Sequence, residues 1–161
     1  MHQLSIADLH REMRAARLSS ERLIEQASEQ AARHAALNAL MWTDWDGALA
    51  EARACDRELA RGRWRGPLHG IPVSIKDLYN VRGTVMAAGT RAPLPPLLPE
   101  EAIAVQRLRA AGAVIFAKTN MHEIALGATG ENEWTGDVCN PHAPQRQAGG
   151  SSSGAGVAVA T

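Results

Sequence analysis

Residues 71–77 read IPVSIKD, a short apolar segment with a proline near its start and a lysine close to its end. Isoleucine and valine favour a strand, and proline is tolerated where a strand begins. Residues 113–117, AVIFA, have the same character and are followed by Lys118. Residues 100–111 lie between the two segments and have a helical pattern that ends at Gly112. Strand, crossover helix and strand predict a parallel βαβ unit. The apolar face of this helix is expected to hold Ile103, Ala104, Leu108 and Ala111.

The first third of the chain has helical patterns. Ser5, with Asp8 three residues later, forms the sequence pattern of a capping box. Ser19 or Ser20 can cap a second helix, and a third helical pattern covers residues 45–61. These helices bring no polar cluster together, so packing rather than chemistry is their expected role.

Composition changes at Gly62, and this change suggests a division of the chain. We interpret residues 1–61 as a helical arm and residues 62–161 as the start of an α/β core. Residues 91–99 are rich in proline and are expected to be irregular. Residues 127–150 read as a long polar loop, and loops of that length are more often functional than idle.

Charge and composition exclude several classes of function. The 17 basic and 17 acidic residues give no net charge, so nothing favours nucleic acid or a membrane surface as a partner. No apolar run approaches the roughly 20 residues that span a bilayer. The two cysteines make no disulfide framework and the first residues lack a secretory signal, so a cytoplasmic location is expected. The histidines have no metal-ligand spacing, so neither a metal nor a cofactor is expected.

Lys76 stands where the first strand ends, and the carboxyl ends of strands are where sites form in open α/β sheets. Burial at such a position removes hydration from the ammonium group and lowers the pKa of the lysine. A neutral lysine can then accept a proton from a hydroxyl group. The alternative is a salt bridge from Lys76 to Asp77 or to another carboxylate.

Residues 149–154 read GGSSSG and precede a small apolar helical segment. Such a loop is compatible with three interpretations. It can bind a phosphate or carboxylate at the helix N-terminus, supply a serine for nucleophilic or relay chemistry, or form only a tight turn. No Gly-Lys-Ser/Thr sequence follows Gly150, which excludes a Walker A motif.

Three further residues are candidates for a role at a site. His122, beside Glu123, either orients a substrate or begins a surface helix. Trp134 either walls a pocket or packs. Asn120 follows the second strand and is expected to tighten the turn there.

Five segments in this order resemble the amidase signature family: residues 66–77, 118–123, 130–132, 140–141 and 149–154. The similarity extends over essentially the whole chain, and the combination is far more specific than any one segment. The resemblance implies an α/β fold, the N-terminal part of a layered α/β/α domain with a mixed central sheet.

The resemblance also implies a Ser–cisSer–Lys triad that hydrolyses amides. Lys76 matches the family lysine, and Ser151 matches the bridging serine that follows a cis peptide bond. Ser152 is implied to be a hydrogen-bond partner of Lys76. The implied substrate-lining turn consists of Ala125, Leu126 and Gly127.

In the family, the nucleophilic serine lies well beyond the bridging serine, in a segment that also forms the oxyanion hole. Thr161 comes too early for it. We therefore expect the chain to be an N-terminal fragment that is inactive alone. The implied substrate is a small-molecule amide, and the full-length enzyme can form a homodimer.

Two alternatives remain open. One is the glutamine-hydrolysing subunit of a glutamyl/aspartyl-tRNA amidotransferase, which resembles simple amidases in this region and would involve tRNA. The other, from a different class, is a non-catalytic module that binds an anion with the Gly-Ser loop.

Overall fold

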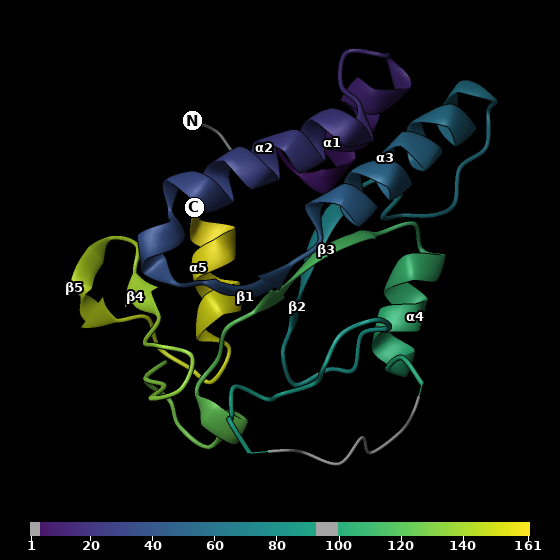
Figure 1. The fold of residues 1–161 in the computed structure, drawn as a ribbon. Coiled ribbons are helices and arrows are strands. Elements are labelled where there is room, and N and C mark those ends of the chain that lie inside the picture. The colour runs from purple at the N-terminus through teal and green to yellow at the C-terminus, as the bar shows by residue number, and fades with distance from the viewer. Residues whose placement is uncertain (1–3, 93–99) are drawn as a thin grey trace. The chain divides into compact units, whose positions relative to one another are not determined.

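The computed structural model describes residues 4–92 and 100–161 (Figure 1). The α-helices are α1 (Ile6–Arg14), α2 (Ser20–Arg33), α3 (Trp45–Ala60), α4 (Ile103–Ala110) and α5 (Ser153–Ala160), and the short 3₁₀ helices are η1 (Ala35–Leu37) and η2 (Glu123–Ala125). The strands are β1 (Leu40–Thr43), β2 (Pro72–Lys76), β3 (Val114–Thr119), β4 (Cys139–Asn140) and β5 (Ala143–Gln147). Most of the segment predicted to be irregular, residues 93–99 of 91–99, lies outside the described residues.

Three strands form a mixed sheet in the order β1-β3-β2. The Val114 N–H donates to the Ile71 carbonyl at 2.9 Å, and the Asp77 N–H donates to the Thr119 carbonyl at 3.2 Å. The start of β2 therefore pairs with the start of β3 and the end with the end, so the two strands run parallel. Leu40 pairs with Thr119 in an antiparallel register between β1 and β3. The predicted βαβ unit is confirmed, and the sheet is mixed because of β1.

Strand β1 lies within the region whose sequence pattern is helical. It has only four residues, of which two are exposed, so it lacks the alternation that identifies a strand in sequence. Strand β3 is buried at all six positions, as expected for a central strand covered on both faces. Tertiary pairing with β3 therefore decides the conformation of residues 40–43.

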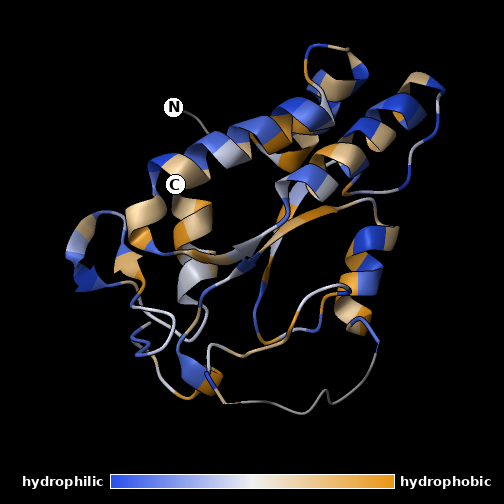
Figure 2. Cartoon of the chain, viewed as in Figure 1, coloured by the Kyte–Doolittle hydropathy of each residue, from blue (hydrophilic) through white to orange (hydrophobic). Residues whose placement is uncertain are grey.

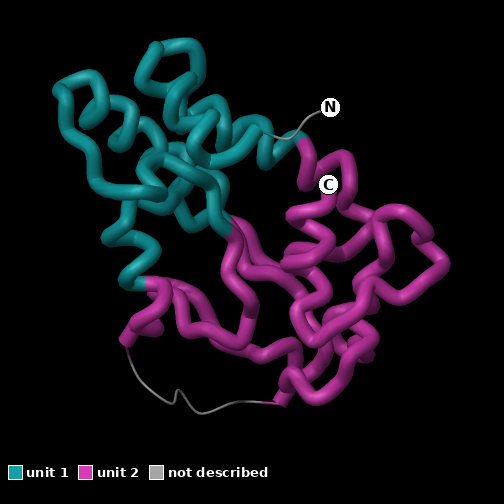
Figure 3. The backbone as a smooth tube through the Cα atoms, turned by 180° about the vertical axis from the view of Figure 1, so that it is seen from behind, with its two compact units in different colours: residues 1–29, 44–73, 106–116 teal, residues 30–43, 74–105, 117–161 magenta. Residues whose placement is uncertain are grey.

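The chain divides into two compact units (Figure 3). The first contains residues 1–29, 44–73 and 106–116, and the second contains residues 30–43, 74–105 and 117–161. Strands β2 and β3 both continue from the first unit into the second. Every candidate site residue belongs to the second unit, and the proposed division into a helical arm and an α/β core stays a prediction.

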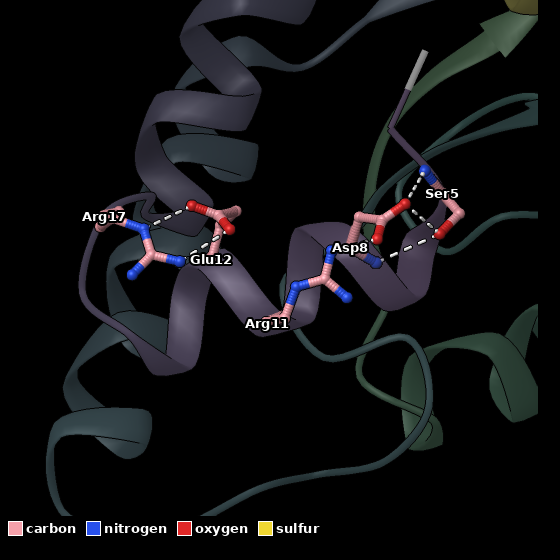
Figure 4. A network of polar contacts seen from close by, with 5 residues as sticks. All are labelled: Ser5, Asp8, Arg11, Glu12 and Arg17. Carbon is pink, nitrogen blue, oxygen red and sulfur yellow. Dashed lines mark hydrogen bonds and ion pairs between the residues drawn. The ribbon is translucent and has the colours of Figure 1, made fainter. Parts of the chain in front are cut away.

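In the first unit, α1 begins with the predicted capping box. Ser5 Oγ accepts from the Asp8 N–H at 3.2 Å, and Asp8 Oδ2 accepts from the Ser5 N–H at 3.1 Å. Glu12 forms an exposed pair with Arg17 through two hydrogen bonds of 2.7 and 2.8 Å (Figure 4). These contacts define the ends of α1 without contributing to any site.

The N-terminus of α2 is capped from two sides. Ser19 Oγ accepts from the Arg22 N–H at 3.0 Å, as predicted from the sequence. The carboxylate of Asp56, on α3, accepts from the N–H groups of Ser20 at 2.7 Å and Glu21 at 3.0 Å. The second cap ties α2 to α3 and has no signal in the local sequence.

His69 is fully buried in the first unit. Its Nδ1 atom accepts from the Arg65 N–H at 3.2 Å, and its Nε2–H faces the Cys55 carbonyl at 3.2 Å. The ring stacks on Trp64 with 4.5 Å between the ring centroids. Burial lowers the pKa of His69, because a charged imidazole would lose its hydration there.

Apolar residues are concentrated in β3 and α5, which appear in orange tones in Figure 2. In the second unit, Leu37, Val138 and Val157 form a buried cluster.

The prediction of which α4 residues face the core is wrong, because Val105 is buried whereas Ile103 is 65% exposed. The predicted loop 127–150 contains an antiparallel hairpin of β4 and β5. Among the described residues, no helix combines the length and apolar character needed to cross a membrane.

Candidate active site

The end of β2 and the loop before α5 bring Lys76 and Ser151 together. The distance from Lys76 Nζ to Ser151 Oγ is 2.8 Å, which is a hydrogen bond, and both residues are partly buried. Two of the residues singled out in the sequence therefore meet, although they are far apart in the chain.

The surroundings of Lys76 lower the pKa of its ammonium group, and loss of hydration is the cause. A larger fraction of Lys76 is therefore neutral at a given pH than for an exposed lysine. A neutral amine has a lone pair, so in that form the contact reverses and Nζ accepts the hydrogen of the Ser151 hydroxyl. The pair can move a proton from oxygen to nitrogen.

The backbone around Ser151 is constrained on both sides. The peptide bond between Gly150 and Ser151 is cis, as the family resemblance implies. The Ser151 carbonyl accepts from the His122 N–H at 3.1 Å. A Cβ atom on Gly150 would lie 3.1 Å from the Gly130 nitrogen, so the glycine allows the loop to approach residues 127–130 closely.

Helix α5 is docked onto the end of β3 through backbone groups. The Gly154 N–H donates to the Asn120 carbonyl at 3.0 Å, and the Asn120 N–H donates to the Ala39 carbonyl at 2.8 Å. A Cβ atom on Gly154 would overlap the Ala39 carbonyl oxygen and would lie 2.7 Å from the Asn120 nitrogen. Glycine at position 154 is therefore required by this close approach.

The side chain of Asn120 uses both of its polar atoms. Its Nδ2 donates to the Asn38 carbonyl at 3.2 Å and to the Gly136 carbonyl at 3.1 Å. Its Oδ1 accepts from the Met121 N–H at 2.8 Å and from the Thr135 hydroxyl at 2.7 Å. The predicted role of Asn120 in one turn is thus too narrow, because the residue joins three segments.

Asp77, the residue that follows Lys76, forms a buried ion pair with Lys118. Lys118 Nζ is 2.6 Å from Asp77 Oδ1, and both side chains are 1% exposed. Asp77 Oδ2 accepts from the Gly89 N–H at 3.0 Å, while Lys118 Nζ donates to the Val85 carbonyl at 2.9 Å. Asp77 thus pairs with Lys118, and Lys76 Nζ donates to Ser151.

The remaining predicted site residues surround the Ser151 loop. Ser152 is the exposed N-cap residue of α5. Ala125 has a left-handed backbone with φ of 60°, and Leu126 is 86% exposed. The carbonyl of Gly127 would lie 3.2 Å from a Cβ atom on Gly150, so this turn adjoins the loop. The roles of Ser152 and of the turn remain predictions.

Sequence reasoning missed one feature of the loop. The hydroxyl of Ser153 is buried and has no hydrogen-bond partner among the described residues. The sequence could not predict this, because nothing in it distinguishes Ser153 from the two serines before it. No group of three or more His, Cys, Asp or Glu residues in the described part of the chain is arranged to hold a metal ion.

Comparison with known proteins agrees with this geometry. The family model described as amidase matches residues 22–161. A glutamyl-tRNA(Gln) amidotransferase subunit from Azoarcus sp. (strain BH72) is 40% identical over 161 residues, which cover 99% of this chain and 33% of that protein.

Solved structures give the same result for the fold. A crystal structure described as an amidase is 55% identical, with a TM-score of 0.93 over 98% of this chain and 36% of the other. The peptide amidase from Stenotrophomonas maltophilia is 39% identical, with a TM-score of 0.89 over 99% of this chain and 34% of the other. The chain therefore spans about a third of the length of these relatives. Its sequence and its mixed α/β fold together show that it belongs to the amidase family.

Proposed function

We propose that this chain supplies the base and the relay of a cytoplasmic Ser–cisSer–Lys amidase. The observation that supports this most is the 2.8 Å contact of Lys76 Nζ with Ser151 Oγ, which follows the cis peptide bond. The reaction cleaves the C–N bond of a small-molecule carboxamide and gives a carboxylic acid and ammonia or an amine.

In the proposed reaction, neutral Lys76 accepts the proton of the Ser151 hydroxyl, and Ser151 accepts the proton of a nucleophilic serine. The nucleophile forms a bond to the amide carbonyl carbon, and the C–N bond then breaks to leave an acyl-enzyme. The relay returns the proton to the departing nitrogen. Water repeats the sequence on the acyl-enzyme and releases the acid.

The nucleophilic serine and the oxyanion-hole donors are assigned to a segment that the family places after the region matched here. Without them the covalent route lacks its attacking atom, and loss of an oxyanion-hole donor alone costs about 3–4 kcal/mol of transition-state stabilisation. We therefore propose that residues 1–161 do not hydrolyse amides by themselves.

The test compares ammonia release by two polypeptides on a panel of carboxamides. One is residues 1–161, and the other is the product of a longer reading frame that contains them. We expect activity only in the longer product, and we expect Lys76→Ala to abolish it. Turnover by residues 1–161 would overturn the proposed incompleteness, and inactivity of the longer product on every amide would overturn the amidase assignment.

A second candidate is the glutamine-hydrolysing subunit of a tRNA-dependent amidotransferase. The observation that favours it is the 40% identity to the glutamyl-tRNA(Gln) amidotransferase subunit from Azoarcus sp. over 161 residues. In that case the longer product should release ammonia from glutamine and should co-purify with partner proteins. A stand-alone amidase would instead turn over other amides without a partner.

A further inference from the structure

His122 is joined to the Ser151 loop and to the neighbouring turn by separate contacts. Its backbone N–H donates to the Ser151 carbonyl at 3.1 Å, and its carbonyl accepts from the Ala125 N–H at 3.0 Å. The Nδ1 atom of its ring lies 3.2 Å from Thr129 Oγ1. One residue thus connects the candidate relay serine with both ends of the turn at 125–129.

The contacts of Thr129 fix the tautomer of this imidazole. A hydroxyl group has one hydrogen, and Thr129 Oγ1 donates it to Glu131 Oε2 at 2.9 Å. An ionised carboxylate can only accept, so the hydroxyl oxygen faces His122 Nδ1 with a lone pair. The neutral ring of His122 must therefore carry its proton on Nδ1, which leaves the lone pair on Nε2.

The carboxylate that completes this chain of contacts is itself held in place. Glu131 Oε1 accepts from Gln147 Nε2, on β5, at 3.0 Å, and the Glu131 N–H donates to Thr129 Oγ1 at 3.3 Å. Thr129 Oγ1 thereby uses its one hydrogen and both lone pairs. The His122 ring is thus linked through Thr129 and Glu131 to the side chain of Gln147 on β5.

Gly127 lies directly against the His122 ring. A Cβ atom on Gly127 would overlap His122 Cε1 and Nε2 and would lie 2.5 Å from Cδ2. The backbone of Gly127 is not in the left-handed region, and the three atoms nearest to the added carbon all belong to the imidazole. A side chain at position 127 would therefore displace the His122 ring.

We propose that His122 is a positioning residue: its backbone N–H holds the Ser151 loop near Lys76, and its ring, kept in the Nδ1–H tautomer by Thr129 and Glu131 and packed against Gly127, fixes that backbone in place. This role rests on the proposed function, because it acts through Ser151.

The first test is spectroscopic and needs no turnover. In residues 1–161 labelled with ¹⁵N-histidine, long-range ¹H–¹⁵N spectra should show the His122 proton on Nδ1. Thr129→Val should lose this preference, and the conservative Thr129→Ser should keep it. A proton on Nε2 in the unmodified chain would overturn the proposed network.

The second test asks whether Ser151 depends on the ring. We expect His122→Ala and Gly127→Ala each to move the ¹⁵N titration midpoint of Lys76, while Gly156→Ala, an exposed helical control, leaves it unchanged. Adding Gly127→Ala to His122→Ala should have a smaller effect than Gly127→Ala alone, because the ring atoms nearest to the added methyl group are then absent. An unchanged Lys76 midpoint in folded His122→Ala, or full additivity of the two changes, would overturn the role.

The third test separates this role from the proposed function. In the longer gene product, Thr129→Val should lower kcat by about 10- to 100-fold through misplacement of Ser151, and Thr129→Ser should restore it. If the spectroscopic results hold and no amide is hydrolysed by the unmodified product, the function fails, while the contacts of His122 with Ser151, Thr129 and Gly127 stand. If hydrolysis is normal in Thr129→Val, the positioning role fails and the function stands.

Discussion

Lys118 and Asp77 form an ion pair with 2.6 Å between Nζ and Oδ1, and each side chain is only 1% exposed. The pair joins the end of β3 to the residue that directly follows Lys76. Because Asp77 also accepts from Gly89 and Lys118 also donates to Val85, the same two side chains fasten the loop that follows β2. The candidate base is thus held next to a buried pair of opposite charges.

Removing one member of this pair should be strongly destabilising. Asp77→Asn leaves the Lys118 ammonium buried without its countercharge, so we expect the free energy of unfolding to fall by about 3–5 kcal/mol. Urea denaturation followed by circular dichroism measures the change. Replacing both partners, with Asp77→Leu and Lys118→Met, should recover much of the loss, which keeps the prediction testable if Asp77→Asn does not fold.

The matched control is the exposed pair of Arg17 and Glu12 (Figure 4). Their side chains are 61% and 29% exposed, so solvent screens the interaction. Glu12→Gln should therefore cost less than about 1 kcal/mol. Equal losses in Glu12→Gln and Asp77→Asn would show that burial does not set the strength of the Asp77–Lys118 pair.

Lys76 should titrate below the ordinary lysine pKa of about 10.4, because it loses hydration in the folded chain. The chain has only two lysines, so ¹⁵N-lysine labelling gives two side-chain signals, and Lys76→Met identifies the one that belongs to Lys76. The amide hydrolysis of the longer product should rise with pH as Lys76 becomes neutral. A midpoint at or above the ordinary value would refute the proposed base.

The lowered pKa of Lys76 also predicts how the stability of the chain depends on pH. Between the lowered folded pKa of Lys76 and its unfolded value, the unfolded state binds more protons than the folded state. Lys76 should therefore make the free energy of unfolding rise with pH across that window. Lys76→Met should remove this contribution, and urea midpoints measured across the window would detect its loss.

Acid should destabilise the first unit through His69. Its pKa is lowered by burial, so below about 6.5 the unfolded state takes up a proton before the folded state does. The free energy of unfolding should fall as the pH drops through this range, and His10, whose pKa burial also lowers, acts in the same direction. His69→Gln should flatten the dependence, and urea midpoints measured across this pH range would detect the change.

Two glycines of α5 should respond oppositely to alanine. At Gly154 the added methyl group would meet backbone atoms of Ala39 and Asn120, and we expect a loss of about 1–3 kcal/mol. At Gly156 nothing lies within 4 Å, so alanine should add about 0.5–1 kcal/mol through helix propensity. Thermal unfolding of the two variants compares them directly. A gain at both positions would mean that the docking of α5 is loose.

Much of the fold could be predicted because the deciding signals are local. The apolar runs of β2 and β3, the capping box at Ser5 and the glycine-rich start of α5 each depend on a few adjacent residues. Strand β1 could not be predicted in this way, because its conformation comes from pairing with β3. The exposure of Ile103 was mispredicted for a related reason, since periodicity shows an apolar face but not what covers it.

In the candidate site, too, the features with local sequence signals could be predicted and the long-range contacts could not. The positions of Lys76 and Ser151 follow from strand-end and loop patterns and from the family resemblance, and the structure brings their side chains together. The partner of Asp77 could not be predicted, because Lys76 and Lys118 were both available to it. The network of His122, Thr129 and Glu131 was hidden because its members are spread over a loop without periodicity.

The backbone link from Gly154 through Asn120 to Ala39 has a consequence for biosynthesis. It joins three segments that are far apart in the chain, and contacts of such large sequence separation form slowly. During translation, residues 38–43 and the end of β3 emerge before α5 exists. On the ribosome, therefore, Lys76 emerges before Ser151 is synthesised, and the contact between them can form only after the loop at 149–154 has emerged.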